Sequence, residues 1–193
     1  MDKYEIHNCI CDIINISFKR LSNVYNDNKQ NRTSTASRLV FPHYRKSNTL
    51  RISEQELRFI FVEVFNQYCD ENGLNLFYSI ETPSLDTYDF TRTPQRSDYG
   101  QSAMFDLVIF DEDYKRRALI EFKANNAGDK EHEKDLVKLS NRNEGSEDVL
   151  RYFIEIIDNY DGGTTSSLAR KLANADSMVI KVYSLRKDKI IDL

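Results

Sequence analysis

Apolar residues recur along the chain with two different periods, which predicts a mixture of helices and strands. Apolar side chains return every three to four residues in 2–26 and in 53–72, as expected for helices with one buried face. Short runs rich in Val, Ile and Phe follow at 76–81, 103–110 and 118–123, and such runs are typical of buried strands. The pattern therefore predicts two helices followed by the first strands of a sheet.

The second half of the chain is predicted to add further helices and a closing strand. Residues 130–139 show a charged helical pattern, and 146–160 show apolar residues at helical spacing behind a polar cap. A short helix is expected over 165–173 and a strand over 177–184. Residues 84–102 show no clear period and are interpreted as a loop that lies over the mouth of a site.

Length and element order together predict one domain. The chain has 193 residues, of which 40% are hydrophobic and 30% charged, which is ordinary for a globular protein. We expect a single α/β domain over 1–193, with a mixed central sheet flanked by helices. Its core would span about 50–185, and the N-terminal helix and a basic loop would occupy 1–52. The sequence has no apolar run long enough to cross a membrane, so a cytoplasmic location is expected by default.

One Asp, one Glu and one Lys interrupt the apolar runs of the two central strands. Asp106 lies inside the first run, and Glu121 and Lys123 fall at the end of the second. The polar segment 111–117 between the runs predicts a turn, and hence a hairpin. An even turn centred between residues 113 and 114 would set Asp106 opposite Glu121, with Lys123 on the diagonal. A slip of one residue would remove this arrangement.

Two neighbouring carboxylates in an apolar sheet need a cation to neutralise them. Mg²⁺ takes carboxylate and carbonyl oxygens and keeps several waters, so Asp106, Glu121 and the backbone carbonyl of Phe122 form a candidate metal site. Lys123 would orient the attacking water or balance charge on a phosphoryl group. The alternative is a set of charges on a solvent-exposed face, and the apolar neighbours on both sides of each charge argue against it.

The helix predicted to begin after Ser53 contributes another acid. Ser53 and Glu56 have the spacing of a capping box. At about 100° per residue, the apolar face of this helix centres near Leu57, and Glu54 lies roughly 50° from that centre. Glu63 lies more than about 100° away on the same wheel. Glu54 is therefore the acid at the buried edge, unless it only favours the helix dipole as an acid of the first turn.

Together these residues resemble a known nuclease family. Asp106, followed after fourteen residues by Glu121-Phe122-Lys123, is similar to the core motif of the PD-(D/E)xK nuclease superfamily, with Phe105 standing where the family name has Pro. Glu54-Gln-Glu-Leu57 has the form of an E-x-E-L stretch in archaeal Holliday-junction resolvases, whose first Glu belongs to the site. The resemblance spans roughly 50–140. It implies a restriction-endonuclease-like core, metal-dependent phosphodiester hydrolysis and, often, a homodimer.

A basic segment precedes the helix of Glu54. The net charge of −4 is not that of a general nucleic-acid coat protein, but the charges are unevenly distributed. From Asn28 to Ser53 there is no acid, while six Lys and Arg residues are present. We expect this basic segment, residues 29–51, to contact a phosphate backbone, unless it is merely a solvated loop. Its candidate contact residues are Arg38, Arg45, Lys46 and Arg51.

The predicted helix at 130–139 carries three further polar residues on one side. His132, Asp135 and Lys138 are separated by steps of three. A single His on a charged helix is usually at the surface, so His132 is interpreted as a surface residue. Lys138 is left without an assigned role.

The expected function is that of a nuclease that requires Mg²⁺ or Mn²⁺. Glu54, Asp106, Glu121 and Lys123 would form its catalytic set, and DNA is favoured over RNA as the substrate. Two other interpretations stay open. One is a non-catalytic nucleic-acid-binding or interaction module on the same fold, and the other is a phage-defence-type effector nuclease that needs a partner or a small-molecule signal.

Overall fold

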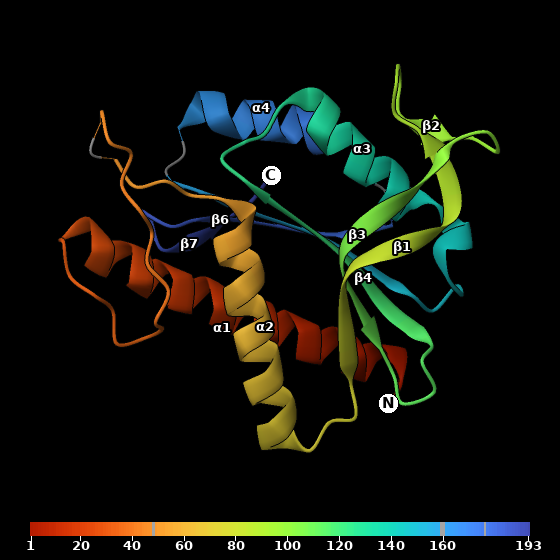
Figure 1. The fold of residues 1–193 in the computed structure, drawn as a ribbon, viewed down its shortest axis with the longest axis horizontal. Coiled ribbons are helices and arrows are strands. Elements are labelled where there is room, and N and C mark those ends of the chain that lie inside the picture. The colour runs from red at the N-terminus through yellow and green to blue at the C-terminus, as the bar shows by residue number, and fades with distance from the viewer. Residues whose placement is uncertain (48, 159–160, 176) are drawn as a thin grey trace.

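The computed structural model describes residues 1–47, 49–158, 161–175 and 177–193. Within these ranges the protein is α/β, with a seven-stranded mixed sheet and four α-helices (Figure 1). The helices are α1 (Lys3–Lys29), α2 (Glu54–Asn72), α3 (Asp129–Ser140), a 3₁₀ turn η1 (Arg142–Glu144) and α4 (Gly162–Leu172). The strands are β1 (Phe77–Asp89), β2 (Gln95–Arg96), β3 (Gln101–Phe110), β4 (Arg116–Ala124), β5 (Leu150–Ile157), β6 (Val179–Ser184) and β7 (Lys189–Ile191).

The sheet joins an antiparallel half to a parallel half. Its strand order is β2-β1-β3-β4-β5-β6-β7. The first four strands in this order pair antiparallel, β4, β5 and β6 pair parallel, and β7 returns antiparallel to β6. The parallel connections run through α3 and α4, as parallel neighbours require. Strand β4 is thus the boundary between the two halves.

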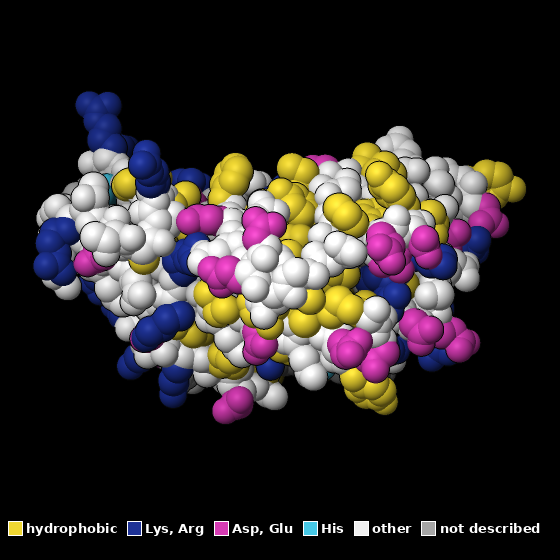
Figure 2. Space-filling view, turned by 90° about the horizontal axis from the view of Figure 1, so that it is seen from below, with side chains coloured by type: hydrophobic (Ala, Val, Ile, Leu, Met, Phe, Trp, Pro, Cys, Tyr) yellow, Lys and Arg dark blue, Asp and Glu magenta, His cyan; other side chains and the backbone are white. Residues whose placement is uncertain are grey.

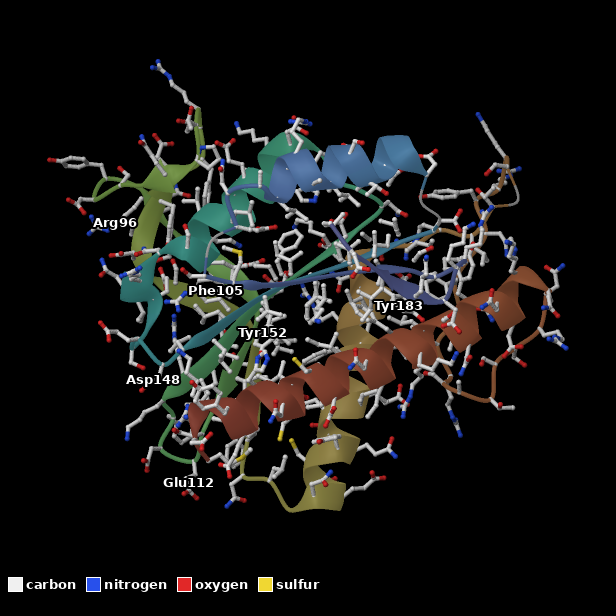
Figure 3. The ribbon with its side chains drawn as sticks, turned by 180° about the vertical axis from the view of Figure 1, so that it is seen from behind. Arg96, Phe105, Glu112, Asp148, Tyr152 and Tyr183 are labelled. Carbon is white, nitrogen blue, oxygen red and sulfur yellow. The ribbon has the colours of Figure 1, made fainter. Side chains whose placement is uncertain are left out.

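Helices cover both faces of the sheet (Figures 1 and 3). Helices α1 and α2 pack on one face, where the Phe18 and Tyr183 rings stack with centroids 4.5 Å apart. Figure 3 shows Tyr152 and Tyr183 beside α1, and the Tyr152 hydroxyl lies 2.8 Å from Nδ1 of His7. Helices α3 and α4 pack on the opposite face over Phe105 and Phe153. No helix among the described residues is long and apolar enough to span a bilayer.

The predicted ends of α2 are confirmed. Ser53 is its N-cap and forms a reciprocal capping box with Glu56. Gly73 ends the helix in the left-handed conformation, with φ of 62°. This cap fixes the first turn of α2, in which Glu54 lies.

The register of the β3–β4 hairpin also agrees with the prediction. Leu107 pairs with Ile120, so one further residue along each strand sets Asp106 against Glu121. Strand β4 pairs only with residues 107–110 of β3, whereas β1 also pairs with the earlier part of β3. The two strands therefore diverge next to Asp106 and Glu121.

The turn of this hairpin differs from the expected one, and a bulge compensates for the difference. An odd number of residues, 111–115, forms the loop, and the Asp111 amide donates to the Lys115 carbonyl at 3.1 Å. Tyr114 lies in the left-handed region with φ of 58°. The ladder then shifts between Ile109 and Phe110, which restores the register that an even turn gives.

The helix predicted over 146–160 is wrong, because most of this segment is the strand β5. Its apolar residues fit helical spacing, but Tyr152 and Ile154 between them are apolar and buried as well. A run that is apolar on both sides is typical of a central parallel strand, and β5 lies between β4 and β6. Residues 159–160 of the predicted helix lie outside the described residues.

The loop predicted over 84–102 is wrong in part, because β1 continues to Asp89. The carboxylate of Glu144, in η1, is fully buried and holds this extension. It accepts hydrogen bonds from the Leu85 amide at 2.7 Å, the Asp86 amide at 3.1 Å and the Tyr88 hydroxyl at 2.6 Å. Such a contact, between residues almost 60 positions apart, has no local signal in the sequence.

Replacing Glu144 with Ala is expected to destabilise the protein strongly. The change removes the acceptor of the Leu85 and Asp86 amides and of the buried Tyr88 hydroxyl, and the ion-pair partner of Arg116, which lies 3.2 Å away. Loss of one partner from a buried ion pair costs about 3–5 kcal/mol. Urea unfolding followed by circular dichroism would measure the loss. The exposed Asp148→Ala is the control, with an expected change within about 0.5 kcal/mol, and equal effects of the two substitutions would contradict the prediction.

Candidate functional site

Three elements meet where β3 and β4 diverge. Strand β3 supplies Asp106, β4 supplies Glu121 and Lys123, and the first turn of α2 supplies Glu54. Glu121 is 1% exposed, and the side chains of Asp106 and Lys123 are 13% and 12% exposed. The structure therefore brings together the four residues that the sequence predicted as a catalytic set.

Helix α3 adds the buried Asp135 and the buried Lys138 to this group. Lys138 Nζ lies 2.6 Å from Glu121 Oε1 and 3.0 Å from Asp135 Oδ1, and Asp135 Oδ2 lies 2.6 Å from Lys123 Nζ. Lys123 Nζ is also 3.8 Å from Glu54 Oε2. The charges thus form one chain of contacts from β4 through α3 to α2.

Asp106 is held by two donors. The Phe122 amide donates to Asp106 Oδ2 at 2.7 Å, and Arg58 of α2 pairs with Oδ1. Arg58 also lies 2.5 Å from Glu81 of β1. Arg58 therefore bridges two acids from neighbouring strands, and it occupies one of the two Asp106 oxygens.

Burial and neighbouring acids perturb the titration of the site carboxyls. Burial raises the pKa of Glu121 well above its usual range, and Asp135 and Asp106 raise it further, while Lys138 opposes them. Burial also raises the pKa of Glu54, with Asp106 adding to the effect and Lys123 opposing it. Both carboxyls therefore lie in surroundings that disfavour their charged forms.

The lysines of the site remain cationic. Burial alone would lower the pKa of Lys123, but Asp135 and Glu54 outweigh this effect and the net pKa is raised. The pKa of Lys138 is raised for the same reason, with Glu121 and Asp135 opposing the burial effect. Neither lysine is suited to act as a base near neutral pH.

A cavity of about 340 Å³ opens beside Glu54 and Lys123. Arg51, Asn125 and Glu131 also line it. The Asn125 side chain closes one edge by donating to the Ile52 carbonyl at 2.6 Å. Solvent thus reaches the site beside Glu54 and Lys123, whereas Glu121 is fully buried.

The basic segment of residues 29–51 leads into α2 and so ends at the site. Arg38, Arg45 and Lys46 are exposed, whereas Arg51 is partly buried and lies 2.7 Å from Glu56. Figure 2 shows Lys and Arg side chains gathering at the end of the molecule that carries the segment after α1. Arg51 thus has an acidic partner within the chain, while the other three cations face solvent.

The sequence interpretation of α3 needs one correction. His132 is 1% exposed, not a surface residue, and its Nε2 lies 3.0 Å from Glu155 of β5. Asp135 and Lys138, one and two steps of three further on, are buried on the same side of the helix. The common spacing of the three residues was the available signal that this polar side faces the sheet.

Sequence reasoning also missed Arg58. It lies four residues after Glu54, about 40° from it on the helical wheel, so both side chains project toward the same part of the sheet. The wheel that selected Glu54 therefore also pointed to Arg58. It was overlooked because only carboxylates were sought as metal ligands.

The acids of the site have the charge that a metal ion needs, but their side chains are not gathered as a set of metal ligands. Among the described residues, no three His, Cys, Asp or Glu side chains are gathered so as to hold a metal ion. The carboxylates are instead paired with Arg58, Lys123 and Lys138. Glu121 Oε1 and Asp135 Oδ2 are buried, and each lies 2.6 Å from a lysine Nζ, that of Lys138 and of Lys123 respectively. A metal ion at these oxygens would have to displace the two ammonium groups.

Comparison with known proteins does not identify the chain. No protein-family model matches it, and no curated protein matches it. The function must therefore be inferred from the side chains of the site.

Glu121→Gln is expected to stabilise the metal-free protein above neutral pH. The folded protein holds a proton on Glu121 at pH values where the unfolded chain has released it, since the pKa is raised from 4.5. The wild type therefore loses stability as the pH rises above about 4.5, and Gln does not. Urea unfolding in EDTA would show the variant as the more stable protein at about pH 8 and a smaller difference at about pH 4.

The control for this experiment is Glu112→Gln, an exposed acid at the hairpin turn. Its stability should follow the wild type across the pH range. A Glu121→Gln protein that is less stable than the wild type at about pH 8 would show that the Lys138 pair outweighs burial.

Proposed function

We propose that this protein is a metal-dependent nuclease of the PD-(D/E)xK type. The observation that carries the proposal is the convergence of Asp106, Glu121 and Lys123 where β3 and β4 diverge, with Glu54 above them. Residues of these types at the end of two buried strands suit phosphodiester hydrolysis, which needs cation ligands and a fixed positive charge.

The topology supports the same proposal. An antiparallel β3–β4 hairpin continues into a parallel β4–β5 pair through a crossover helix, with α2 packed across the strands that carry the acids. We infer that this arrangement is a restriction-endonuclease-like core. On this view α1 and the basic segment precede that core.

Asp106, Glu121 and the carbonyl of Phe122 would hold a divalent cation such as Mg²⁺ or Mn²⁺. A hard divalent cation supplies Lewis-acid chemistry to a phosphodiester. Its charge would relieve the unfavourable ionisation of Glu121, whose pKa burial raises. Arg58 and Lys138 would then have to share or release their carboxylate partners.

Lys123 and Glu54 are placed for the chemical step at the open side of the site. Both line the cavity, and Lys123 keeps its proton because Asp135 and Glu54 favour its charged form. A fixed ammonium there stabilises the extra negative charge of a phosphoryl transition state and orients a nucleophilic water. Glu54, 3.8 Å from Lys123, would hold a second metal ion or a metal-bound water.

The substrate follows from the charges around the site. The exposed cations Arg38, Arg45 and Lys46 lie on the segment that leads to α2, so a phosphate backbone bound there would run toward the cavity. We expect DNA in preference to RNA, and a homodimer would supply one site for each strand of a duplex. An effector nuclease that depends on a signal would use the same site.

One observation favours a different function, a nucleic-acid-binding module without catalysis. Arg58 and Lys138 already pair with both of the proposed metal-binding carboxylates. A permanent internal pairing would make a metal unnecessary for folding. Metal binding that disappears in Asp106→Ala distinguishes the nuclease from this module.

Cleavage is expected to require a divalent metal together with Asp106 and Lys123. The wild type, Asp106→Ala and Lys123→Ala would be tested with Mg²⁺ or Mn²⁺ on plasmid, linear duplex, branched and single-stranded DNA, and RNA. Loss of one electrostatic contact to a transition state lowers rates by about 10²–10³-fold, so both variants should fall at least this far. Lys134→Ala, on α3 but outside the network, is the control for lost charge.

Metal binding measured by calorimetry on the same proteins separates the remaining outcomes. Cleavage lost in both variants and retained in Lys134→Ala supports the nuclease. Bound metal without cleavage on any substrate points to a missing activator. If the wild type neither binds a metal nor cleaves any substrate, the proposal is contradicted and the binding module remains.

The basic segment is expected to contribute salt-dependent affinity. In EDTA, Arg45→Ala and Lys46→Ala should each weaken duplex DNA binding and reduce the slope of log K against log salt by about 0.9. Fluorescence anisotropy at several salt concentrations would measure this slope. The exposed Lys187→Ala is the control, and an equal decrease in all three variants would assign the effect to net charge alone.

A further inference from the structure

A second cavity lies at the end of the sheet opposite the candidate site. It measures about 410 Å³ and is lined by the start of β5, the start of β6 and the residues that follow α3. Because β4 and β5 run parallel, Leu150 at this cavity pairs with Ala118, whereas Lys123 at the candidate site pairs with Glu155. Five residues of extended strand, or about 16 Å, therefore separate this cavity from the candidate site.

Three cations line this cavity. Lys3 comes from the first turn of α1, Arg142 from η1 and Arg151 from β5. Figure 3 shows Asp148, next to the lining residue Glu147, near the start of α1. Lys3 Nζ donates to the Glu147 carbonyl at 3.2 Å, which joins the two sides of the cavity.

Arg151 is a buried cation without a carboxylate partner. It is 9% exposed, and no carboxylate of the described residues forms an ion pair with it. Its guanidinium donates only to backbone carbonyls, at 2.8 Å to Val149 and 3.4 Å to Asn141, and its Nε has no partner in the described part of the chain. A buried charge in this condition is costly unless an anion compensates it.

The surroundings of Arg151 make its charged form still less favourable. Burial lowers its pKa, and the positive charge of Arg142 lowers it further, while Glu144 opposes the effect. Glu144 itself already binds Arg116 and three donors of β1. Arg142 is exposed and makes no ion pair with any described residue. The chain thus places two guanidinium groups near each other without an acid between them.

The charge and the wall of the cavity define the kind of ligand that fits. Three cations and the single lining acid Glu147 leave a formal charge of two positive units. A phosphate monoester group carries about −1.5 to −2 at neutral pH, and guanidinium groups bind phosphate oxygens in pairs. Val149 and Val179 supply an apolar wall, and the volume lies within the range of about 300–1,000 Å³ of small-molecule pockets.

We propose that this cavity binds a small phosphate ester, with its phosphate between Lys3, Arg142 and Arg151 and its apolar body against Val149 and Val179. The ligand supplies the anion that Arg151 lacks. The site is separate from the carboxylate site, and its occupancy does not depend on a divalent metal.

Calorimetric titration in EDTA at about 0.15 M salt tests this proposal. The probes are inorganic phosphate, adenosine monophosphate and adenosine. The wild type is compared with Arg142→Gln and Lys3→Gln, whose side chains are not buried, and with Arg92→Gln, an exposed arginine outside the cavity, as the matched control. Circular dichroism verifies that each variant is folded.

We expect the wild type to bind adenosine monophosphate more tightly than adenosine. Arg142→Gln and Lys3→Gln should each weaken that binding about tenfold or more, as for the loss of a charged hydrogen bond, and Arg92→Gln should leave it unchanged. Asp106→Ala should also bind normally, since it alters only the other site. Absence of phosphate-dependent binding by the wild type, or equal weakening by Arg92→Gln, would overturn the proposal.

Discussion

The burial of Glu121 in the middle of the sheet is the constraint on which this end of the structure depends. An acid that is 1% exposed must be protonated or paired, and here it is paired with Lys138 of α3. Lys138 in turn contacts Asp135, and Asp135 contacts Lys123. Each new charge needs another partner, so the buried carboxylate adds a chain of polar contacts to the apolar packing of α3 on the sheet.

This network permits two ways of neutralising the same acids. Without a metal, the chain uses its own cations, Arg58 and Lys138, and folding needs no ligand. With the divalent ion proposed above, Asp106 and Glu121 would bind the metal, and Arg58 and Lys138 would be released from them to face a phosphate. Buried ion pairs contribute little net stability compared with apolar packing, but loss of one partner from such a pair is strongly destabilising, so the members of this network depend on one another.

The sequence predicted those parts of the fold that rest on local patterns. The capping box of Ser53 and Glu56 follows from spacing alone, whereas the register that sets Asp106 against Glu121 arises from an odd turn and a compensating bulge. The strand β5 was mistaken for a helix because six of its eight residues are apolar, so that helical spacing was present without being informative. Arg58 and Lys138 lie at helical spacings that point toward the sheet, but the acids with which they pair belong to distant segments, which local periodicity does not identify.

The location of the candidate site follows from the position of β4. This strand pairs antiparallel with β3 on one side and parallel with β5 on the other. Its carboxyl end therefore borders both the divergence of the hairpin and the start of the crossover through α3. Open α/β sheets place ligands at carboxyl ends where neighbouring connections diverge, because side chains from several elements can converge there. Glu54 from α2, Asp106 from β3 and Lys123 from β4 converge for this reason.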